Sequence, residues 1–320
     1  MPPPPSTTVN ENSTIYDSRQ YWNDLPQVVA YMSENFTGDP TKWWVDDFKE
    51  RFCPEPLGHG LVLNCGNGWV ERELVDNGIV KTVTAFDSSW DLLCAAARDR
   101  GSRAIHYVRA DANTVSFAPA CFDVVFNVAA LHHVQYLDRP CRVLCEALKP
   151  SGVLVSFDYI GPHRNQYSRG HWRRIVRVNR RLPPAVRKQR LRRALLPYML
   201  HVDPTEAIHS ELILAMVARY FDIFERHDTG GGIAYELLTH NPPLHARGRR
   251  RRTPISARSW PGTGTTGRAG RSHPCSRTSW PARGRMCCRT PRGCVPSRTR
   301  RIDARRGRGR ASACIRSVTT

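Results

Sequence analysis

The sequence predicts a doubly wound α/β fold, with a seven-stranded, mostly parallel sheet and helices on both faces. Apolar runs of strand type alternate with helix-type segments between residues 61 and 159. The run LVLNC (61–65) continues into a turn with closely spaced glycines, and acidic residues follow the next two strand-like runs. Alternation of this kind implies right-handed crossovers and a parallel sheet whose ligands bind beyond the carboxyl ends of the strands.

The expected elements follow from this alternation. We expect strands over 61–65, 80–86, 104–109, 122–127 and 152–159, with helices over about 69–77, 89–99 and 138–148. An aromatic-rich region, residues 15–54, is expected to be helical in pieces, to cap the sheet edge and to roof the ligand cleft. Asp203, with Glu206 three residues on, predicts a capped helix over 203–221. The following FDIFERH, three glycines and IAYELL predict either a strand hairpin or a strand and a helix.

The chemistry starts at the turn after the first strand. Closely spaced glycines, here Gly66 and Gly68, let the backbone approach a ligand, and the N-terminus of the next helix directs free N–H groups toward it. Asp87 lies about 20 residues on, at the end of VKTVTAFD. An acid at the tip of the neighbouring strand is placed to accept hydrogen bonds from both hydroxyls of a ribose. The pattern therefore predicts a site for a nucleoside cofactor.

A dinucleotide fingerprint would need a small residue three positions after Gly68, where this chain has Glu71. Asp111 and Ala112 follow AIHYVRAD, and FDVVFNVAALHHV (122–134) supplies the next strand and loop. This ordered series, over roughly residues 20–240, resembles the class I S-adenosylmethionine-dependent methyltransferases, which have a Rossmann-like fold. The implied cofactor is S-adenosyl-L-methionine.

The resemblance assigns cofactor roles residue by residue. The glycine turn would hold the methionine end, Asp87 the ribose, and Asp111 with Ala112 the adenine. Together the implied cofactor-binding residues are Asn64, Cys65, Gly66, Gly68, Asp87, Ser88, Asp111, Ala112, Asn127 and Val128. The family usually has an acid and a glycine where this chain has Val62 and Asn64. Because Asn tolerates positive φ, we expect the turn to form nevertheless.

Methyl transfer needs little beyond an acceptor held in line with the C–S bond in a dry cleft, and a base where the acceptor is a hydroxyl of high pKa. His132 and His133 are the candidate bases; we expect that adjacent histidines on one loop do not both face inward. Tyr159, His163 and Arg164 are the candidate substrate contacts, since a guanidinium suits a carboxylate or phosphate. Histidines and carboxylates show no local ligand spacing, so we expect no metal site.

Charge is distributed unevenly along the chain. The net charge is +20, yet residues 241–320 hold 21 Arg, no Lys and one acid, which leaves 27 basic and 27 acidic residues in 1–240. That Arg-rich tail has no hydrophobic period and is expected to be disordered. Its composition is typical of a GC-rich coding region read out of frame, and an RNA-binding tail or a linker are the alternatives. Residues 173–193 hold ten Lys and Arg and no acid. They predict two solvated helices around Pro183–Pro184, or an insertion that attracts an anionic acceptor.

The expected domains are a flexible leader (1–14), one catalytic domain (15–240) and the disordered tail (241–320). The catalytic domain would comprise a helical cap (15–54), a cofactor-binding core (55–160) and a basic insertion with terminal strands (161–240). Six cysteines in 1–240 lack Cys-x-x-Cys spacing and are expected to be reduced. With no signal peptide and no long apolar run, the protein is expected to be cytoplasmic, without a membrane partner.

Three functions remain open at this stage. The favoured one is methyl transfer by in-line displacement to a small-molecule or glycan-precursor acceptor. A nucleic-acid methyltransferase would use the basic segments to follow phosphates, and a non-catalytic binding protein would keep the fold alone. The sequence does not fix the oligomeric state.

Overall fold

The computed structural model describes residues 20–248 and 311–318, so the expected leader and most of the expected tail lie outside the described residues. The strands are β1 (Leu57–Val62), β2 (Val80–Asp87), β3 (Ile105–Arg109), β4 (Phe122–Val128), β5 (Leu148–Tyr159), β6 (Phe221–Asp228) and β7 (Ala311–Val318). The α-helices are α2 (Pro26–Thr37), α3 (Trp44–Phe52), α4 (Trp69–Asp76), α5 (Trp90–Asp99), α6 (Asp138–Ala147), α7 (Arg169–Arg181), α8 (Leu196–Val202), α9 (Ile213–Tyr220), α10 (Ala234–Leu238) and α11 (Pro242–Gly248). The 3-10 helices are η1 (Trp22–Asp24), η2 (Leu131–His133), η3 (His163–Asn165) and η4 (Ser210–Leu212).

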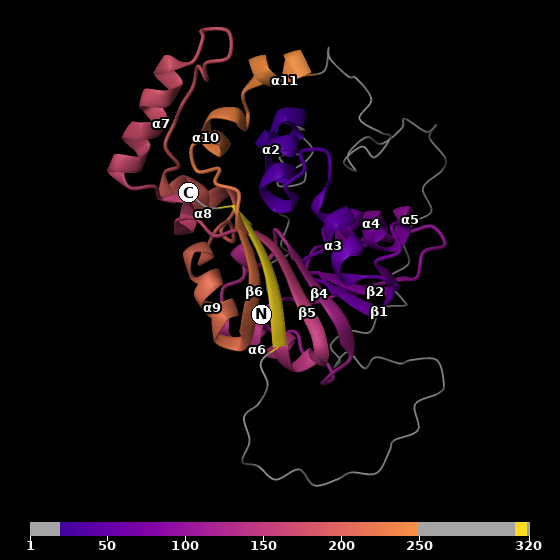
Figure 1. Cartoon of the computed structure of the whole chain (residues 1–320). Coiled ribbons are helices and arrows are strands. Elements are labelled where there is room, and N and C mark those ends of the chain that lie inside the picture. Colours follow the sequence, from indigo (N-terminus) through magenta and orange to yellow (C-terminus); the bar gives the residue numbers. More distant parts are fainter. Residues whose placement is uncertain (1–19, 249–310, 319–320) are drawn as a thin grey trace, which may run out of the picture.

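The strands form one parallel sheet in the order β3-β2-β1-β4-β5-β7-β6 (Figure 1). The predicted α/β Rossmann-like fold with a parallel sheet is thereby confirmed for β1 to β5. The strand order reverses between β1 and β4, and parallel sheets of this kind bind ligands at such a switch point. The turn after β1 and the loops after β2, β3, β4 and β5 all lie at this edge of the sheet.

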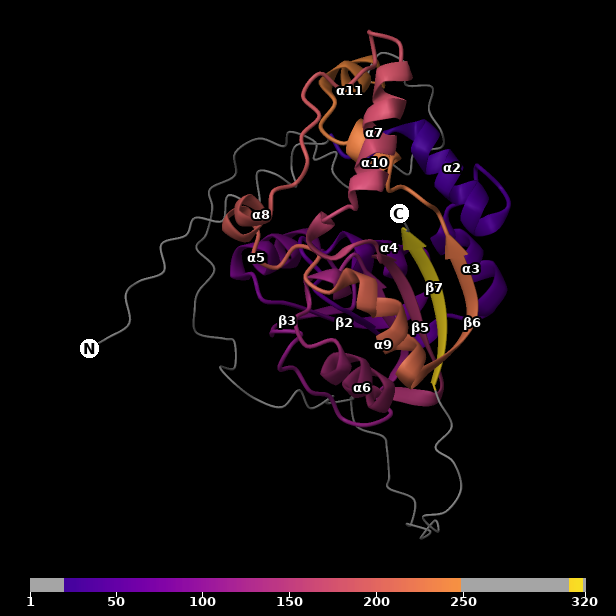
Figure 2. The ribbon, with the colours of Figure 1, turned by 90° about the vertical axis from the view of Figure 1, so that its left-hand side faces the viewer.

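Two hydrophobic cores lie on the two faces of the sheet. Helices cover both of these faces (Figures 1 and 2). Successive residues of one strand point to opposite faces of the sheet, so that Leu61 packs in one core and Val62 in the other. Helices α2 to α5 cover the face of Val62, and α6 with α9 cover the face of Leu61. Helices α7, α8 and α10 lie beyond the carboxyl ends of the strands (Figure 2).

The aromatic N-terminal region covers a face of the sheet and not its edge, which corrects the expectation. Phe36 of α2 packs edge-on against Phe157 of β5, with ring centroids 5.5 Å apart. Phe48 of α3 packs in the same way on Phe126 of β4 at 5.8 Å. These strands lie in the middle of the sheet, so the aromatic side chains are buried in the core.

The segment after β5 differs from its prediction in two ways. Only one helix, α7, forms at the basic run, and residues 182–195 after it are irregular up to α8. The predicted helix over 203–221 begins only at η4. Asp203 Oδ1 accepts hydrogen bonds from the N–H groups of Thr205 and Glu206, at 2.9 and 3.1 Å. A side chain bound to its own local backbone in this way makes a turn that competes with helix formation.

The C-terminal part of the sheet also differs. Residues 234–238 form helix α10, so the hairpin between 221 and 240 does not form. Strand β6 pairs instead with β7, in parallel, and β7 pairs with β5. Two stretches of the predicted disordered tail are thus ordered elements, α11 and β7. Among the described residues, no helix combines the length and apolar character that crossing a membrane requires.

Candidate functional site

The glycine turn after β1 is bound to the carboxyl end of β2. The predicted strand over 61–65 ends early, at Val62, because Asn64 turns the backbone with a φ of 42°. The N–H of Cys65 donates to Phe86 O over 3.0 Å, and the N–H of Gly66 donates to Asp87 Oδ2 over 2.9 Å. Asp87 Oδ1 accepts from the N–H of Ser89 at 2.8 Å. The buried carboxylate thus fixes the turn, while each oxygen retains capacity for another donor.

Positive φ angles occur at both glycines, with different surroundings. At Gly66, with a φ of 55°, a Cβ would meet no atom within 4 Å. At Gly68, with a φ of 77°, a Cβ would lie 2.8 Å from the Cβ of Ala96 and would clash with the Tyr107 hydroxyl. Gly66 therefore borders open space where a ligand can approach the backbone, whereas Gly68 allows α4 to pack closely. The amide of Asn64 donates to Ala130 O at 3.3 Å and links this turn to the loop after β4.

Asp111 lies at the same edge of the sheet. The N–H of Ala110 donates to Asp87 O over 3.0 Å, which joins the end of β3 to the end of β2. Asp111 is exposed, and its Oδ1 accepts from the N–H of Asn113 at 2.8 Å. Ala112 beside it is buried, and Ser88 is exposed at the end of β2. The structure therefore brings the glycine turn, Asp87 and Asp111 together, as the resemblance implies.

Asn127 has a role that the sequence did not predict. Its side chain is fully buried, and its amide donates to Ser156 Oγ and Asp158 Oδ2, each at 2.8 Å. Its oxygen accepts from the N–H of Leu131 at 2.9 Å. The side chain thus fixes the loop after β4, while neighbouring Val128 packs against the core.

A separate group, Glu71 in the first turn of α4, is buried near the glycine turn. Both carboxylate oxygens and the nearby hydroxyl of Tyr107 are buried without a hydrogen-bond partner in the described structure. Burial raises the pKa of Glu71 to about 7. A carboxyl in this setting destabilises the fold when it is charged.

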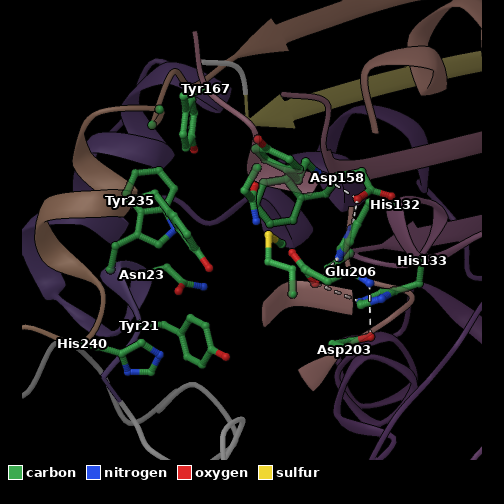
Figure 3. Close-up of a pocket in the computed structure, with 18 of the residues that line it drawn as sticks. Tyr21, Asn23, His132, His133, Asp158, Tyr167, Asp203, Glu206, Tyr235 and His240 are labelled. Carbon is green, nitrogen blue, oxygen red and sulfur yellow. Dashed lines mark hydrogen bonds and ion pairs between the residues drawn. The ribbon is translucent and has the colours of Figure 1, made fainter. Parts of the chain in front are cut away.

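A pocket opens beyond the carboxyl ends of β4 and β5 (Figure 3). Its volume is about 380 Å³, which lies in the range of small-molecule sites. One wall is aromatic and apolar, and it includes Tyr21, Trp22, Met32, Phe157, Tyr159, Tyr167, Tyr198, Met199, Val202 and Tyr235. The other end is polar and holds His132, His133, Asp158, Asp203 and Glu206. No Lys or Arg belongs to the described lining.

In the pocket wall, residues 20–22 contact residues 239–240. The N–H of His240 donates to Gln20 O over 2.7 Å, and the N–H of Trp22 donates to Thr239 Oγ1 over 3.2 Å. The rings of Tyr21 and His240 lie 5.5 Å apart (Figure 3). The aromatic wall therefore depends on contacts between residues that are far apart in the sequence.

His132 and Asp158 form a buried pair at the polar end. His132 Nδ1 lies 2.5 Å from Asp158 Oδ1. Burial lowers the pKa of His132, but the Asp158 carboxylate outweighs that effect and the pKa is about 9. Burial likewise raises the pKa of Asp158, whereas the His132 charge and hydrogen bonds from His132 and Asn127 bring it below its usual range.

His133 faces the same space as His132, which corrects the expectation that adjacent histidines point to opposite sides. The 3-10 helix η2 separates successive side chains by only about 120°, and the two rings lie 4.1 Å apart at their centroids. Each Nε2 lies 3.7 Å from Glu206 Oε2. Burial, followed by the nearby His132, lowers the pKa of His133. Two adjacent histidines of η2 and a carboxylate from the loop before η4 thus lie next to one another.

The three predicted substrate contacts are placed differently from one another. Tyr159 lines the pocket. His163 is exposed and pairs with Glu211 at 3.0 Å, outside the lining. The guanidinium of Arg164 donates to the carbonyl oxygens of Pro204 and Glu206, at 2.5 and 3.4 Å. Arg164 therefore supports the loop that carries Glu206 and does not face the pocket.

The basic run 173–193 is also outside the pocket lining. Helix α7 packs through Ile175 against Leu237 of α10. The described lining thus gives an anionic acceptor no Lys or Arg side chain within the pocket itself.

Sequence reasoning missed the carboxylates of the pocket. Asp158 directly precedes the predicted contact Tyr159, in a run that was interpreted only as a strand. Asp203 and Glu206 were interpreted as a helix cap, although the same spacing also forms the observed turn. The signal available was the position of Asp158 at the end of a parallel strand, where ligands bind.

The similarity of this chain to known proteins lies mainly in the central part of the sheet. Residues 61–156 match the family described as a methyltransferase domain. The chain is 35% identical over 110 residues to a malonyl-[acyl-carrier protein] O-methyltransferase of Enterobacter lignolyticus, which covers 34% of this chain and 42% of the relative. It is 29% identical over 116 residues to a demethylmenaquinone methyltransferase of Leptospira interrogans, which covers 35% and 46%.

Among solved structures, an S-adenosylmethionine-dependent methyltransferase of Mesorhizobium loti is 30% identical, with a TM-score of 0.31, over 33% of this chain and 50% of that one. The chain spans half the length, or less, of the relatives described here. The matched region holds the glycine turn, Asp87, Asp111 and the two histidines. Residues 61–156 therefore match a methyltransferase domain, and over this region the chain is similar to the class I S-adenosylmethionine-dependent methyltransferases.

Proposed function

We propose that this chain transfers a methyl group from S-adenosyl-L-methionine to a small-molecule acceptor held in the aromatic pocket. The observation that carries the proposal is the position of the pocket. It opens at the carboxyl ends of β4 and β5, beside the loop that Asn64 ties to the glycine turn. A cofactor at the turn and an acceptor in the pocket would therefore lie at the same edge of the sheet.

The residues present fit the cofactor. The open space at Gly66 admits a ligand, and the Asp87 carboxylate retains capacity for ribose hydroxyls. Exposed Asp111 and buried Ala112 offer a polar and an apolar contact for an adenine. When bound, S-adenosylmethionine supplies an electrophilic methyl group. The other proposed contacts are Cys65, Gly68, Ser88 and the backbone at Asn127 and Val128.

The pocket supports an acceptor with an apolar or aromatic body and one polar end. Tyrosine, tryptophan and methionine side chains bind flat apolar rings, whereas His132, His133 and Glu206 would hold a hydroxyl or another polar group. Lack of Lys and Arg in the described lining argues against strongly anionic acceptors. One relative is named a malonyl-[acyl-carrier protein] O-methyltransferase, an acceptor carried on a protein, and another a demethylmenaquinone methyltransferase, whose name is compatible with a small organic acceptor.

The chain's own residues would act by holding the acceptor and excluding water. Tyr21, Trp22 and Tyr235 close one side of the pocket, and the histidines with Glu206 orient the acceptor's polar end. Asp158 keeps the ring of His132 in one orientation. Positioning of this kind supplies much of the acceleration in a transfer to an already activated methyl group. We favour a small-molecule methyltransferase over a nucleic-acid enzyme, because the described lining of the pocket holds no Lys or Arg to bind phosphates.

The test has two stages and uses the full chain. Thermal unfolding with S-adenosylhomocysteine at about 100 times Kd should raise Tm by roughly 5 to 10 °C, because that excess stabilises by about 2.7 kcal/mol. A panel of hydroxylated aromatic compounds is then incubated with cofactor carrying a labelled methyl group. Label transfer that falls in a Tyr235→Ala variant supports the proposal. A protein that binds the cofactor but labels no compound of this class would be a binding protein or would have another acceptor.

A further inference from the structure

The polar end of the pocket has the arrangement of a metal site. Three possible ligand atoms, one each from His132, His133 and Glu206, lie within 4.8 Å of one another. Two belong to adjacent residues of η2 and the third to the loop before η4. The three residues do not form a local sequence motif, so the sequence did not predict a metal site here.

The hydrogen bonds around His132 fix which nitrogen faces the pocket. Asp158 Oδ2 accepts from the amide of Asn127 and the N–H of Leu131, and its Oδ1 accepts from the N–H of Tyr159. A carboxylate that accepts from this many donors is the deprotonated form, so the fourth partner, His132 Nδ1, carries a hydrogen. Nε2 is then the nitrogen directed toward Glu206, and it offers its lone pair to a metal ion once its own proton has left.

His133 is fixed in the same sense by a second chain of hydrogen bonds. The hydroxyl of Thr205 donates to Asp203 Oδ1 over 2.7 Å. Its oxygen is therefore the acceptor for His133 Nδ1, which lies 3.1 Å away. As at His132, Nδ1 donates and Nε2 faces Glu206. Each imidazole thus has an outer partner, Asp158 or Thr205, and metal-binding histidines characteristically have such a partner.

Two imidazole nitrogens and one carboxylate oxygen therefore face one another within 4.8 Å. The pocket lining also holds the Asp158 and Asp203 carboxylates and no Lys or Arg among the described residues. This surplus of acceptors and negative charge suits a cation. In a tetrahedral zinc site, a histidine nitrogen and a carboxylate oxygen are about 3.3 Å apart, given metal–ligand bonds of about 2.0–2.1 Å. The two nitrogen–oxygen separations of 3.7 Å need only a small contraction, and the three atoms together, which lie within 4.8 Å of one another, must also draw closer.

We propose that His132, His133 and Glu206 bind one divalent transition-metal ion, of the zinc class. Two histidines and a carboxylate are a ligand set used for zinc and for iron, and they leave further positions of the ion open. Those positions face the pocket. If the function proposed above holds, the ion would take the acceptor's oxygen as a ligand and polarise it, as a Lewis acid does.

The test measures metal binding by the full chain without cofactor or acceptor, so its outcome is independent of methyl transfer. Protein treated with a chelator is titrated with Zn2+ by calorimetry and with Co2+ by visible absorption. We expect one strong site. Glu206→Gln and His133→Ala should each weaken binding at least about tenfold. The matched control is His163→Ala, which removes a histidine that pairs with Glu211 outside the pocket.

The chain also has eleven cysteines, which can bind both ions. X-ray absorption of the zinc-loaded wild-type protein identifies the ligands without any variant and therefore does not depend on whether a variant folds. Nitrogen and oxygen neighbours with the scattering pattern of imidazole support the proposal. Sulfur neighbours alone, equal binding by Glu206→Gln and wild type, or no binding of either ion would overturn it.

Discussion

The backbone N–H of Gly66 donates a hydrogen bond to the carboxylate of Asp87, and this contact joins the turn after β1 to the end of β2 over 2.9 Å. The same carboxylate accepts from Ser89, at the start of α5. One acidic side chain therefore sets the shape of the proposed cofactor site before any ligand binds. We therefore expect Asp87 to affect cofactor affinity both directly and through the structure of the turn.

Asp87→Asn should lower the affinity for S-adenosylhomocysteine at least about tenfold, because the amide group places a donor against a backbone N–H or loses a charged acceptor. Calorimetry with the full chain measures the effect. Exposed Asp99, in the last turn of α5, provides the control, and Asp99→Asn should bind as wild type. Equal affinity in Asp87→Asn and wild type would reject the assignment of Asp87 to the ribose.

Gly66→Ala and Gly68→Ala should separate ligand binding from packing. An added methyl group at Gly66 meets no protein atom, so stability should fall only by the cost of a positive φ, about 1 kcal/mol. Cofactor affinity should fall strongly, because the methyl group fills the ligand's space. At Gly68 the clash with Ala96 and Tyr107 should cost about 1–3 kcal/mol more. A thermal melt and a binding titration measure both effects, and a Gly66→Ala variant destabilised as much as Gly68→Ala would contradict the prediction.

Glu71 should make the protein less stable as pH rises. Its pKa is about 7 in the folded chain, above the ordinary 4.5, so the folded state binds more protons between these values. The contribution of this group to stability therefore falls between about pH 4.5 and 7, by on the order of 3 kcal/mol. Urea unfolding across that range should show the slope in wild type and its loss in Glu71→Gln. Exposed Glu55→Gln should keep the wild-type slope, and a slope unchanged in Glu71→Gln would refute the assignment.

Arg164→Ala should destabilise the loop that carries Glu206. Removal of the guanidinium leaves the carbonyl of Pro204 without its charged donor, which is worth about 1.5–3 kcal/mol. For a domain of this size, that corresponds to a fall in Tm of roughly 3 to 12 °C. Arg192, which is exposed in the basic run 173–193, supplies the control variant Arg192→Ala. An unchanged Tm with weaker binding of an anionic acceptor would instead show that Arg164 contacts substrate.

The core of the fold was predictable because its signals are local. Strands such as β2 and β4 are continuous apolar runs between turn residues, and a parallel sheet follows from their alternation with helices. Asn64 was also predictable as a turn residue, since its short polar side chain tolerates a positive φ. The C-terminal elements were not, because IAYELL has the composition of either a strand or a helix and only packing decides between them.

The candidate site was predictable only in part. Gly66, Asp87 and Asp111 follow strands in a fixed order, so their meeting at one edge is a consequence of the fold. The joining of His133 to Glu206 depends instead on an irregular loop after α8, whose path no periodicity encodes. Arg164 shows the same limit, because a guanidinium next to a predicted site was more simply interpreted as a substrate contact than as a support for a distant loop.

The hydrogen bond between Gln20 and His240 means that part of the pocket wall is a junction between two chain segments that are distant in the sequence. This junction includes the hydrogen bonds of Gln20 with His240 and of Trp22 with Thr239, and the ring contact of Tyr21 with His240. We expect it to open at a lower temperature than the central sheet, whose strands are buried on both faces. Acceptor affinity should therefore decline on warming before cofactor affinity does, since the glycine turn and Asp87 belong to the sheet. An engineered disulfide or a short covalent linker across this junction would let the protein keep its acceptor affinity up to temperatures closer to the melting temperature of the core.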